Sequence, residues 1–145
     1  MGFNRMFSVL DVSSSGLSAE RTRMDVIAGN IANAQTTRTP EGGPYRRKLV
    51  VFSSVLDEEM SIAESGGKDL GGVKVVNIVP STEEFQRVHA PGHPDADKDG
   101  YVMMPNVNTV YEMVDMMSAS RAYQANLAVV DTFREMLSRT LAIGR

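Results

Sequence analysis

The sequence predicts an α+β protein in which long N- and C-terminal helices form a coiled coil and a small β-rich middle segment joins them. Two observations favour this fold class. Apolar residues recur every seven residues at both ends of the chain, with a second apolar position three residues after the first. Between the two ends, β-branched runs alternate with stretches rich in glycine and proline, which is typical of strands joined by turns. We therefore expect three segments, at residues 1–35, 36–105 and 106–145.

The N-terminal helix is expected from residue 3 to residue 34. The spacing of seven places its apolar side chains on one narrow stripe, which a partner helix can cover. Gly16 and Gly29 each cost about 1 kcal/mol relative to alanine inside a helix, so packing has to order this segment. The stripe combines first-position residues Phe3, Leu10, Leu17, Met24 and Ile31 with second-position residues Met6, Ile27 and Ala34.

The C-terminal helix is expected to begin near Asn106 or Asn108, because either asparagine can cap the first amide groups of a helix. Ser120 and Arg134 interrupt its apolar repeat. Since both ends carry a stripe and little chain remains for a separate core, we expect the protein to assemble. Met113, Leu127 and Leu141 hold the first position of the repeat, and Met116, Tyr123, Val130 and Leu137 hold the second.

The middle segment has the pattern of short strands separated by turns. Pro80 is expected to end the second strand, because proline cannot donate to a strand ladder. Residues 57–72 are acidic and contain glycine, which predicts an exposed loop. The strands are expected at 45–55, 73–79 and 85–88, followed by an apolar run at 101–104.

The composition argues against several classes of function. A net charge of −3 gives no general attraction to nucleic acid. The absence of cysteine removes disulfide and thiolate chemistry. No stretch approaches the roughly 18 apolar residues of a membrane span. Asp11 and the serines that follow interrupt the apolar run that a signal peptide needs. We expect no nucleic-acid partner, no membrane span and no cleaved signal peptide.

The sharpest candidate for a binding site is the turn at Asp95, Asp97, Asp99 and Gly100. This spacing matches the opening of an EF-hand calcium loop. The twelfth position, where that loop has a bidentate glutamate, is Asn106. A calcium-dependent binding module is therefore an alternative that we do not favour, and we expect no metal site. The serines and histidines lack the arrangement of a nucleophilic triad, so we expect no catalytic residue and no cofactor.

One short motif carries a resemblance to a known family. Asn30, Asn33 and Thr36 stand in the stretch NIANAQT, which resembles the NIANxxT motif of the axial proteins of the bacterial flagellum. That family comprises the rod, hook and hook-associated proteins. Three further stretches resemble the branch that builds the proximal rod, and the likeness extends over essentially the whole chain. These stretches are GGPYRRK at 42–48, HPDADKDGYVMMPNVN at 93–108 and EMVDMMSASRAYQANL at 112–127.

The resemblance implies a structural subunit of a hollow rod, not an enzyme. In this family the terminal helices pack as a coiled-coil inner layer, and the middle segment forms an outer domain. The implied partners are other flagellar rod proteins, copies of the chain itself and the flagellar export apparatus. The implied location is the rod of the basal body in the periplasmic space, reached by export without cleavage. A secreted coiled-coil effector is a second alternative, because it would share the two apolar stripes.

Four polar or aromatic residues receive specific roles. We expect the amides of Asn30 and Asn33 to bond the last carbonyls of the first helix and so end it. Arg121 and Tyr123 are candidates for contacts between subunits, because arginine and tyrosine supply large, orientable interface area.

The two charges on the stripes, Glu20 and Arg134, predict a register for the helices. In an antiparallel pair the numbers of facing residues add to a constant. A sum of 154 brings Glu20 to Arg134 and Met24 to Val130. A shift of one heptad would leave each charge partly buried and unpaired, at a cost of about 3–5 kcal/mol. The pair can form within one chain or between two.

Overall fold

The computed structural model describes the backbone of residues 2–55 and 71–143 and the side chains of residues 8–55 and 71–142. It confirms the predicted α+β class, with a long helix at each end and strands between them. The elements are α1 (Gly2–Ala32), β1 (Lys48–Ser54), β2 (Val73–Pro80), β3 (Gln86–His89), β4 (Tyr101–Met104) and α2 (Thr109–Ile143).

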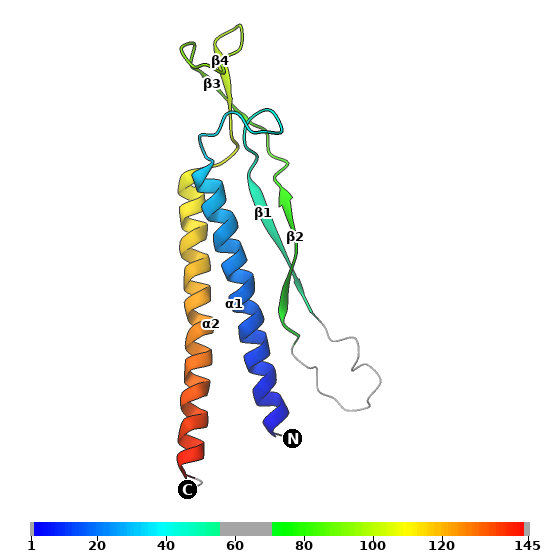
Figure 1. Ribbon diagram of the computed structural model, residues 1–145, viewed down its shortest axis with the longest axis vertical. Coiled ribbons are helices and arrows are strands. Elements are labelled where there is room, and N and C mark those ends of the chain that lie inside the picture. Colours follow the sequence, from blue (N-terminus) through cyan, green and yellow to red (C-terminus); the bar gives the residue numbers. More distant parts are fainter. Residues whose placement is uncertain (1, 56–70, 144–145) are drawn as a thin grey trace.

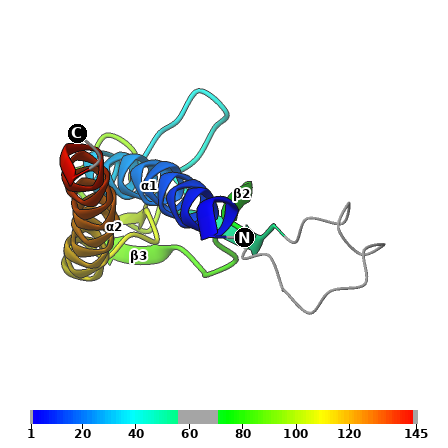
Figure 2. The same cartoon turned by 90° about the horizontal axis from the view of Figure 1, so that it is seen from below.

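The two helices lie side by side and antiparallel, so that both chain ends point the same way (Figure 1). The ribbon of β1 and β2 runs along α1, whereas the hairpin of β3 and β4 lies beyond the opposite end of the helices. Seen from below, α1 separates α2 from β2 (Figure 2). α1 contacts α2, β1 and β2, so it is the element on which the protein is organised.

The strands form two separate antiparallel pairs within the described residues. In the first pair, Lys48 faces Pro80 and Ser54 faces Val73, with a shift in register between Val51 and Phe52. In the second pair, Gln86 to His89 face Met104 to Tyr101. A two-stranded ribbon is marginally stable by itself, so the first pair depends on its packing against α1.

Most element boundaries follow the predictions. Asn108 caps α2, because its Oδ1 accepts hydrogen bonds from the amides of Val110 at 3.0 Å and Tyr111 at 3.3 Å. α1 ends two residues before the predicted end, and the third strand begins one residue later than predicted. β1 begins three residues after the predicted start at residue 45, since the Arg47 amide donates to Asn106 Oδ1 and not to β2. Of the predicted loop at 57–72, residues 57–70 lie outside the described residues.

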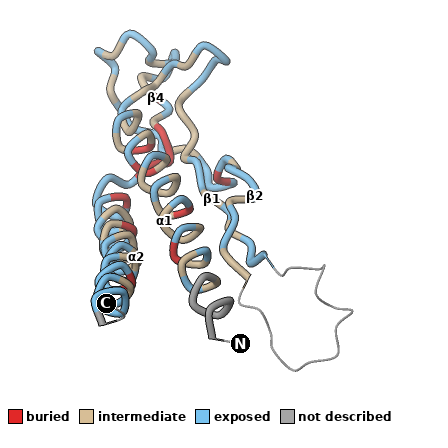
Figure 3. Tube along the Cα trace, turned by 60° about the horizontal axis from the view of Figure 1, so that its bottom comes forward, coloured by how far each residue is buried: buried red, intermediate tan, exposed pale blue. Residues whose placement is uncertain are grey.

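The core is thin. Among the described residues, nineteen large apolar side chains are exposed and only six apolar ones are buried, mostly where α1 meets its neighbours (Figure 3). The helices therefore leave much apolar surface uncovered within one chain. No helix in the described ranges is long and apolar enough to cross a bilayer. The buried apolar residues are Ala19, Ile27, Val102, Val107, Ala119 and Phe133.

Candidate functional site: a polar junction and an open helix pair

The end of α1 is fastened to β1 and α2 by a single amide, that of Asn30. Its side chain is 1% exposed. The Oδ1 atom accepts hydrogen bonds from the Lys48 amide at 2.9 Å and the Tyr45 hydroxyl at 3.1 Å. The Nδ2 atom donates to the Lys48 carbonyl at 2.9 Å and to Glu112 Oε2 at 2.9 Å. An amide offers two donors and two acceptor sites, so the hydrogen-bonding capacity of Asn30 is filled.

Glu112 carries a buried negative charge at the start of α2, and Arg47 balances it. Arg47 Nε lies 2.5 Å from Glu112 Oε1, and Arg47 Nη2 lies 3.4 Å from Asp115 Oδ2. Glu112 is 1% exposed, so its charge is stable there only because a cation and Asn30 satisfy both oxygens. We call Asn30, Tyr45, Arg47, Asn106 and Glu112 the polar junction.

Tyr45 completes the polar junction on the side of the loop. Burial, together with the negative charge of Glu112, raises the pKa of the Tyr45 hydroxyl above its ordinary value of 10.0. The hydroxyl is therefore protonated at neutral pH and available to donate to Asn30. The raised pKa of Tyr45 therefore keeps its hydroxyl proton in the hydrogen bond to Asn30 Oδ1.

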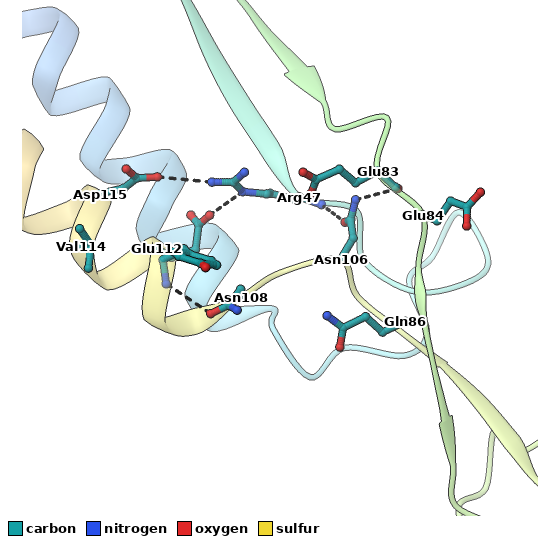
Figure 4. Close-up of a pocket in the computed structure, with 10 residues that line it drawn as sticks. Arg47, Glu83, Glu84, Gln86, Asn106, Asn108, Glu112, Val114 and Asp115 are labelled. Carbon is teal, nitrogen blue, oxygen red and sulfur yellow. Dashed lines mark hydrogen bonds and ion pairs between the residues drawn. The ribbon is translucent and has the colours of Figure 1, made fainter.

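Asn106 ties the strands to the polar junction (Figure 4). Its Oδ1 accepts from the Arg47 amide at 2.8 Å, and its Nδ2 donates to the Glu83 carbonyl at 3.0 Å. These groups line an open pocket of about 580 Å³. Two of the carboxylates at this pocket, Glu112 and Asp115, are engaged by Arg47. The geometry suits a rigid joint better than a site of acid–base chemistry.

The residues of the predicted family motif have two different roles: Asn33 and Thr36 bond near the end of α1, whereas Asn30 bonds β1 and α2. Asn33 behaves as predicted, because its Nδ2 donates to the Gly29 carbonyl at 2.9 Å near the end of α1. Thr36 supports Asn33 through a hydroxyl bond of 3.2 Å to its Oδ1. The predicted role of Asn30 is wrong. Its amide donates to the Lys48 carbonyl and to Glu112 Oε2, and not to a carbonyl of α1.

The two helices approach closely at small residues. A Cβ atom added to Gly16 would lie 2.8 Å from Asn126 Nδ2, and Ala119 is fully buried. Gly16 lies against Asn126 and Asn30 against Glu112, so the residue numbers of each pair add to 142. Within the chain, the predicted sum of 154 is therefore wrong.

The stripe predicted on α1 lies at or beside the contact with its neighbours. Ile27 is buried. The side chains of Phe3 and Met6 lie outside the described residues. The half-buried members are Leu10, Leu17, Met24, Ile31 and Ala34.

The stripe predicted on α2 is displaced by one residue within the chain. Its second position is half-buried, but its first position is exposed. The residues that precede the predicted first position face α1 instead, and among them the small Ala119 is fully buried where the helices approach closely. Met113, Leu127 and Leu141 are thus exposed, Met116, Tyr123, Val130 and Leu137 are half-buried, and Glu112, Ala119, Asn126 and Phe133 take the inner position. Arg121 is exposed, and its predicted contact, like that of Tyr123, is with another subunit.

Glu20 and Arg134 do not meet within the chain. The cation nearest to Glu20 is Arg23, at 3.8 Å from Oε2, and this buried oxygen has no hydrogen-bond partner. In the observed register, Glu20 is level with Ala122. Arg134 lies twelve residues farther along α2, or about 18 Å at 1.5 Å per residue.

In the acidic turn, the carboxylate of Asp97 accepts hydrogen bonds from backbone amides of the same turn. Asp97 Oδ1 accepts hydrogen bonds from the amides of Tyr101 and Asp99, both at 2.9 Å. The Tyr101 bond is the main reason that the pKa of Asp97 lies below its ordinary value of 3.8. Asp95 Oδ2 accepts from the Thr37 hydroxyl at 2.8 Å. In the described part of the chain, no three acidic, histidine or cysteine residues are arranged to hold a metal ion.

The sequence does not single out most of the polar junction as a site. Tyr45 and Arg47 stand in the stretch GGPYRRK and the expected strand at 45–55, and Glu112 stands in EMVDMM. A usable signal was present, because Glu112 occupies a heptad position together with Ala119 and Phe133. A charge in that position requires a partner, and an arginine is the usual one.

Comparison with known proteins gives matches at both ends of the chain. Residues 10–38 match the family described as flagella basal body rod protein. Residues 98–143 match the family described as flagellar basal body rod FlgEFG protein C-terminal.

Whole proteins match over almost their full length. The chain is 44% identical to the flagellar basal-body rod protein FlgC of Borreliella burgdorferi, with 95% of this chain and 97% of that protein covered. It is 42% identical to FlgC of Salmonella typhimurium, with coverages of 97% and 98%. It is also 42% identical to FlgC of Bacillus subtilis, with coverages of 96% and 98%. The chain belongs to the family of the flagellar basal-body rod protein FlgC.

Proposed function

We propose that the chain is a structural subunit of the proximal rod of the bacterial flagellar basal body, and that its terminal helices assemble into the wall of the hollow drive shaft. The observation that carries this proposal is its likeness to FlgC proteins over at least 95% of its length. The alternatives of a calcium module and a secreted effector have no comparable support.

The open helix pair fits a subunit that completes its packing in an assembly. On α2, Met113 is 58% and Leu141 is 75% exposed. Such apolar surface is unfavourable in water and is buried when another helix covers it. Ordering of the helix ends near the termini is then coupled to assembly, as for other segments that lack a core of their own.

The polar junction supplies what a mechanical part needs, namely a fixed angle between the helices and the strands. Asn30 and Glu112 join α1, β1 and α2 through side chains that are each 1% exposed. A load applied to the strands therefore reaches both helices through several hydrogen bonds and an ion pair. No catalytic role forms part of this proposal.

The proposed partners are other flagellar rod proteins, further copies of the chain and the flagellar export apparatus. The proposed location is the rod in the periplasmic space. Export without a cleaved signal peptide fits the interrupted apolar run at the N-terminus.

A swimming assay tests the proposal in cells that depend on this chain for motility. Replacing both Met113 and Leu127 with glutamate puts charges on exposed apolar positions, so we expect at least a tenfold loss of swimming cells and of rods. Thr132→Glu is the matched control, because it adds a charge at an exposed position of the same helix and should leave swimming intact. Normal swimming of the double variant would contradict the proposal.

A further inference from the structure

The loop between α1 and β1 forms part of an open pocket that carries an excess of positive charge. Figure 2 shows this loop, in cyan, projecting away from both helices. The pocket has a volume of about 780 Å³, and every residue that lines it lies between the end of α1 and the start of β3. Its charged lining residues are Arg38, Arg46, Lys48 and one acid, Glu41. We call it the loop pocket.

No anion of the chain pairs with these cations among the described side chains. None of the ion pairs in this part of the chain involves Arg38, Arg46 or Lys48. Three cations against one carboxylate leave an excess of two positive charges in the loop pocket. The chain as a whole has a net charge of −3, so this excess is local.

Arg46 is held in position before any partner arrives. Its Nη1 atom donates to the Ser81 carbonyl at 2.9 Å and to the Glu83 carbonyl at 3.2 Å. The guanidinium carbon lies 4.2 Å from the centre of the Phe85 ring. Among the described residues, only Nη1 of this guanidinium has hydrogen-bond partners, so its other N–H groups are available to an anion.

Backbone hydrogen bonds fix the loop that carries Arg38. The Thr39 amide donates to the Gly43 carbonyl at 2.9 Å, and the Tyr45 amide donates to the Thr36 carbonyl at 2.9 Å. Gly43 has a φ of 80°, and a Cβ atom added there would meet nothing within 4 Å, so the backbone conformation requires glycine while the space beside it stays open. A loop that is already ordered loses little conformational entropy when a partner binds.

Apolar rings lie among the cations of the loop pocket. Pro40, Pro44, Pro80 and Phe85 also line it. This lining suits a peptide in which apolar side chains stand beside acidic ones, because arginine pairs with carboxylates and the rings cover the apolar groups. Inorganic phosphate would use the cations alone, and a densely charged polyanion would be repelled by the net negative charge of the chain.

The carboxylates of the acidic turn of this chain are already engaged. Asp95 Oδ2 accepts a hydrogen bond from the Thr37 hydroxyl at 2.8 Å. Asp97 accepts from two amides of its own turn and lies 3.5 Å from Arg87 Nη2. A second copy would present the same engaged groups, which favours a different protein as the source of the acidic peptide.

We propose that the loop pocket binds an acidic peptide segment of a different protein, whose carboxylates pair with Arg38, Arg46 and Lys48. The inference goes beyond the proposed function, because no residue that lines the loop pocket belongs to a helix.

Fluorescence anisotropy of the full chain with a short labelled peptide, rich in glutamate and leucine, tests the proposal. We expect binding at about 0.05 M salt that weakens at least about tenfold at about 0.5 M salt, because salt screens exposed charges. A second peptide with glutamine in place of each glutamate should bind at least about tenfold more weakly at the lower salt concentration. Equal binding of the two peptides would contradict the proposal.

A pair of double variants locates the binding. Arg38→Gln with Lys48→Gln removes two exposed cations of the loop pocket and should weaken binding of the glutamate peptide about tenfold. Lys74→Gln with Arg134→Gln is the matched control, because it changes the net charge equally at exposed positions outside the loop pocket. The control should bind within about twofold of the unchanged protein. Equal losses in the two double variants would mean that overall charge, and not the loop pocket, attracts the peptide.

Competition with other anions tests the assignment to a peptide. Inorganic phosphate, or a carboxylated polysaccharide such as hyaluronate, should displace the glutamate peptide only at a concentration at least about tenfold higher. Displacement at equal concentration would overturn the assignment. Self-association of the chain that disappears in Arg38→Gln with Lys48→Gln would indicate a second copy as the partner, and would overturn it as well. These measurements are independent of the swimming assay, so failure of this inference leaves the proposed function standing.

Discussion

The two ends of the helix pair differ in what completes their packing. At the end near the strands, Asn30 and Glu112 are each 1% exposed and are satisfied by partners in the same chain. At the end near the termini, α2 leaves Met136 45% and Leu141 75% exposed. The difference teaches that one polypeptide satisfies the buried polar groups of its joint by itself, whereas apolar surface along α2, from Met113 to Leu141, stays uncovered within the chain.

The largest expected effect comes from removing the buried charge of the polar junction. Glu112→Ala leaves Arg47 without its closest anion and Asn30 Nδ2 without one of its two acceptors, so we expect a loss of about 3–5 kcal/mol in unfolding free energy. Urea unfolding followed by circular dichroism measures it. Glu135→Ala is the control near the termini. It breaks an exposed ion pair with Arg139 and should change stability by less than about 0.5 kcal/mol. Equal effects would show that the two ends do not differ.

A smaller effect is expected where the strand ribbon meets the middle of α1. A Cβ atom at residue 72 would lie 2.4 Å from Ser15 Oγ and 2.9 Å from Ser15 Cβ. Gly72→Ala should therefore displace Ser15, break its bond to the Val73 amide and cost about 1–3 kcal/mol in the same urea experiment. Gly92→Ala meets nothing within 4 Å and serves as the control. Unchanged stability of Gly72→Ala would mean that the ribbon is not fastened at Ser15.

The smallest effect concerns alkaline pH at the polar junction. The raised pKa of Tyr45 means that the unfolded chain loses this proton at lower pH than the folded chain does. The resulting stability is complete below about pH 10 and is lost as pH rises through the folded pKa. Unfolding free energies measured from about pH 9 upward should fall less steeply in Tyr45→Phe than in the unchanged protein. If the unfolding free energies of Tyr45→Phe and of the unchanged protein fell equally with pH, Tyr45 would not belong to the polar junction.

Much of the fold was accessible from the sequence, because local patterns determine it. The β-branched runs placed β1 and β2, and Asn108 was one of two predicted caps for α2. The register of the helices was not accessible in this way. It depends on Gly16 and Ala119, whose small size permits a close approach but adds little to an apolar pattern.

The apolar repeat was also ambiguous in a physical sense. A heptad pattern marks surfaces that become buried, whether by the same chain or by another. On α2, Val130 is half-buried by its own chain, whereas Leu127 is exposed, and both belong to the same repeat. The polar junction escaped prediction because its partners, Asn30 and Glu112, are 82 residues apart.

Hydrogen exchange on the free chain tests most directly whether the joint is complete and the tips are not. We expect the amides of α1 near Asn30 and of α2 near residues 112–123 to exchange at least about a hundredfold more slowly than those of α2 near residues 133–142. In assembled rods the tips should gain protection while the polar junction changes little. Equal protection along α2 in a verified monomer, or faster exchange at the polar junction than at the tips, would contradict the account.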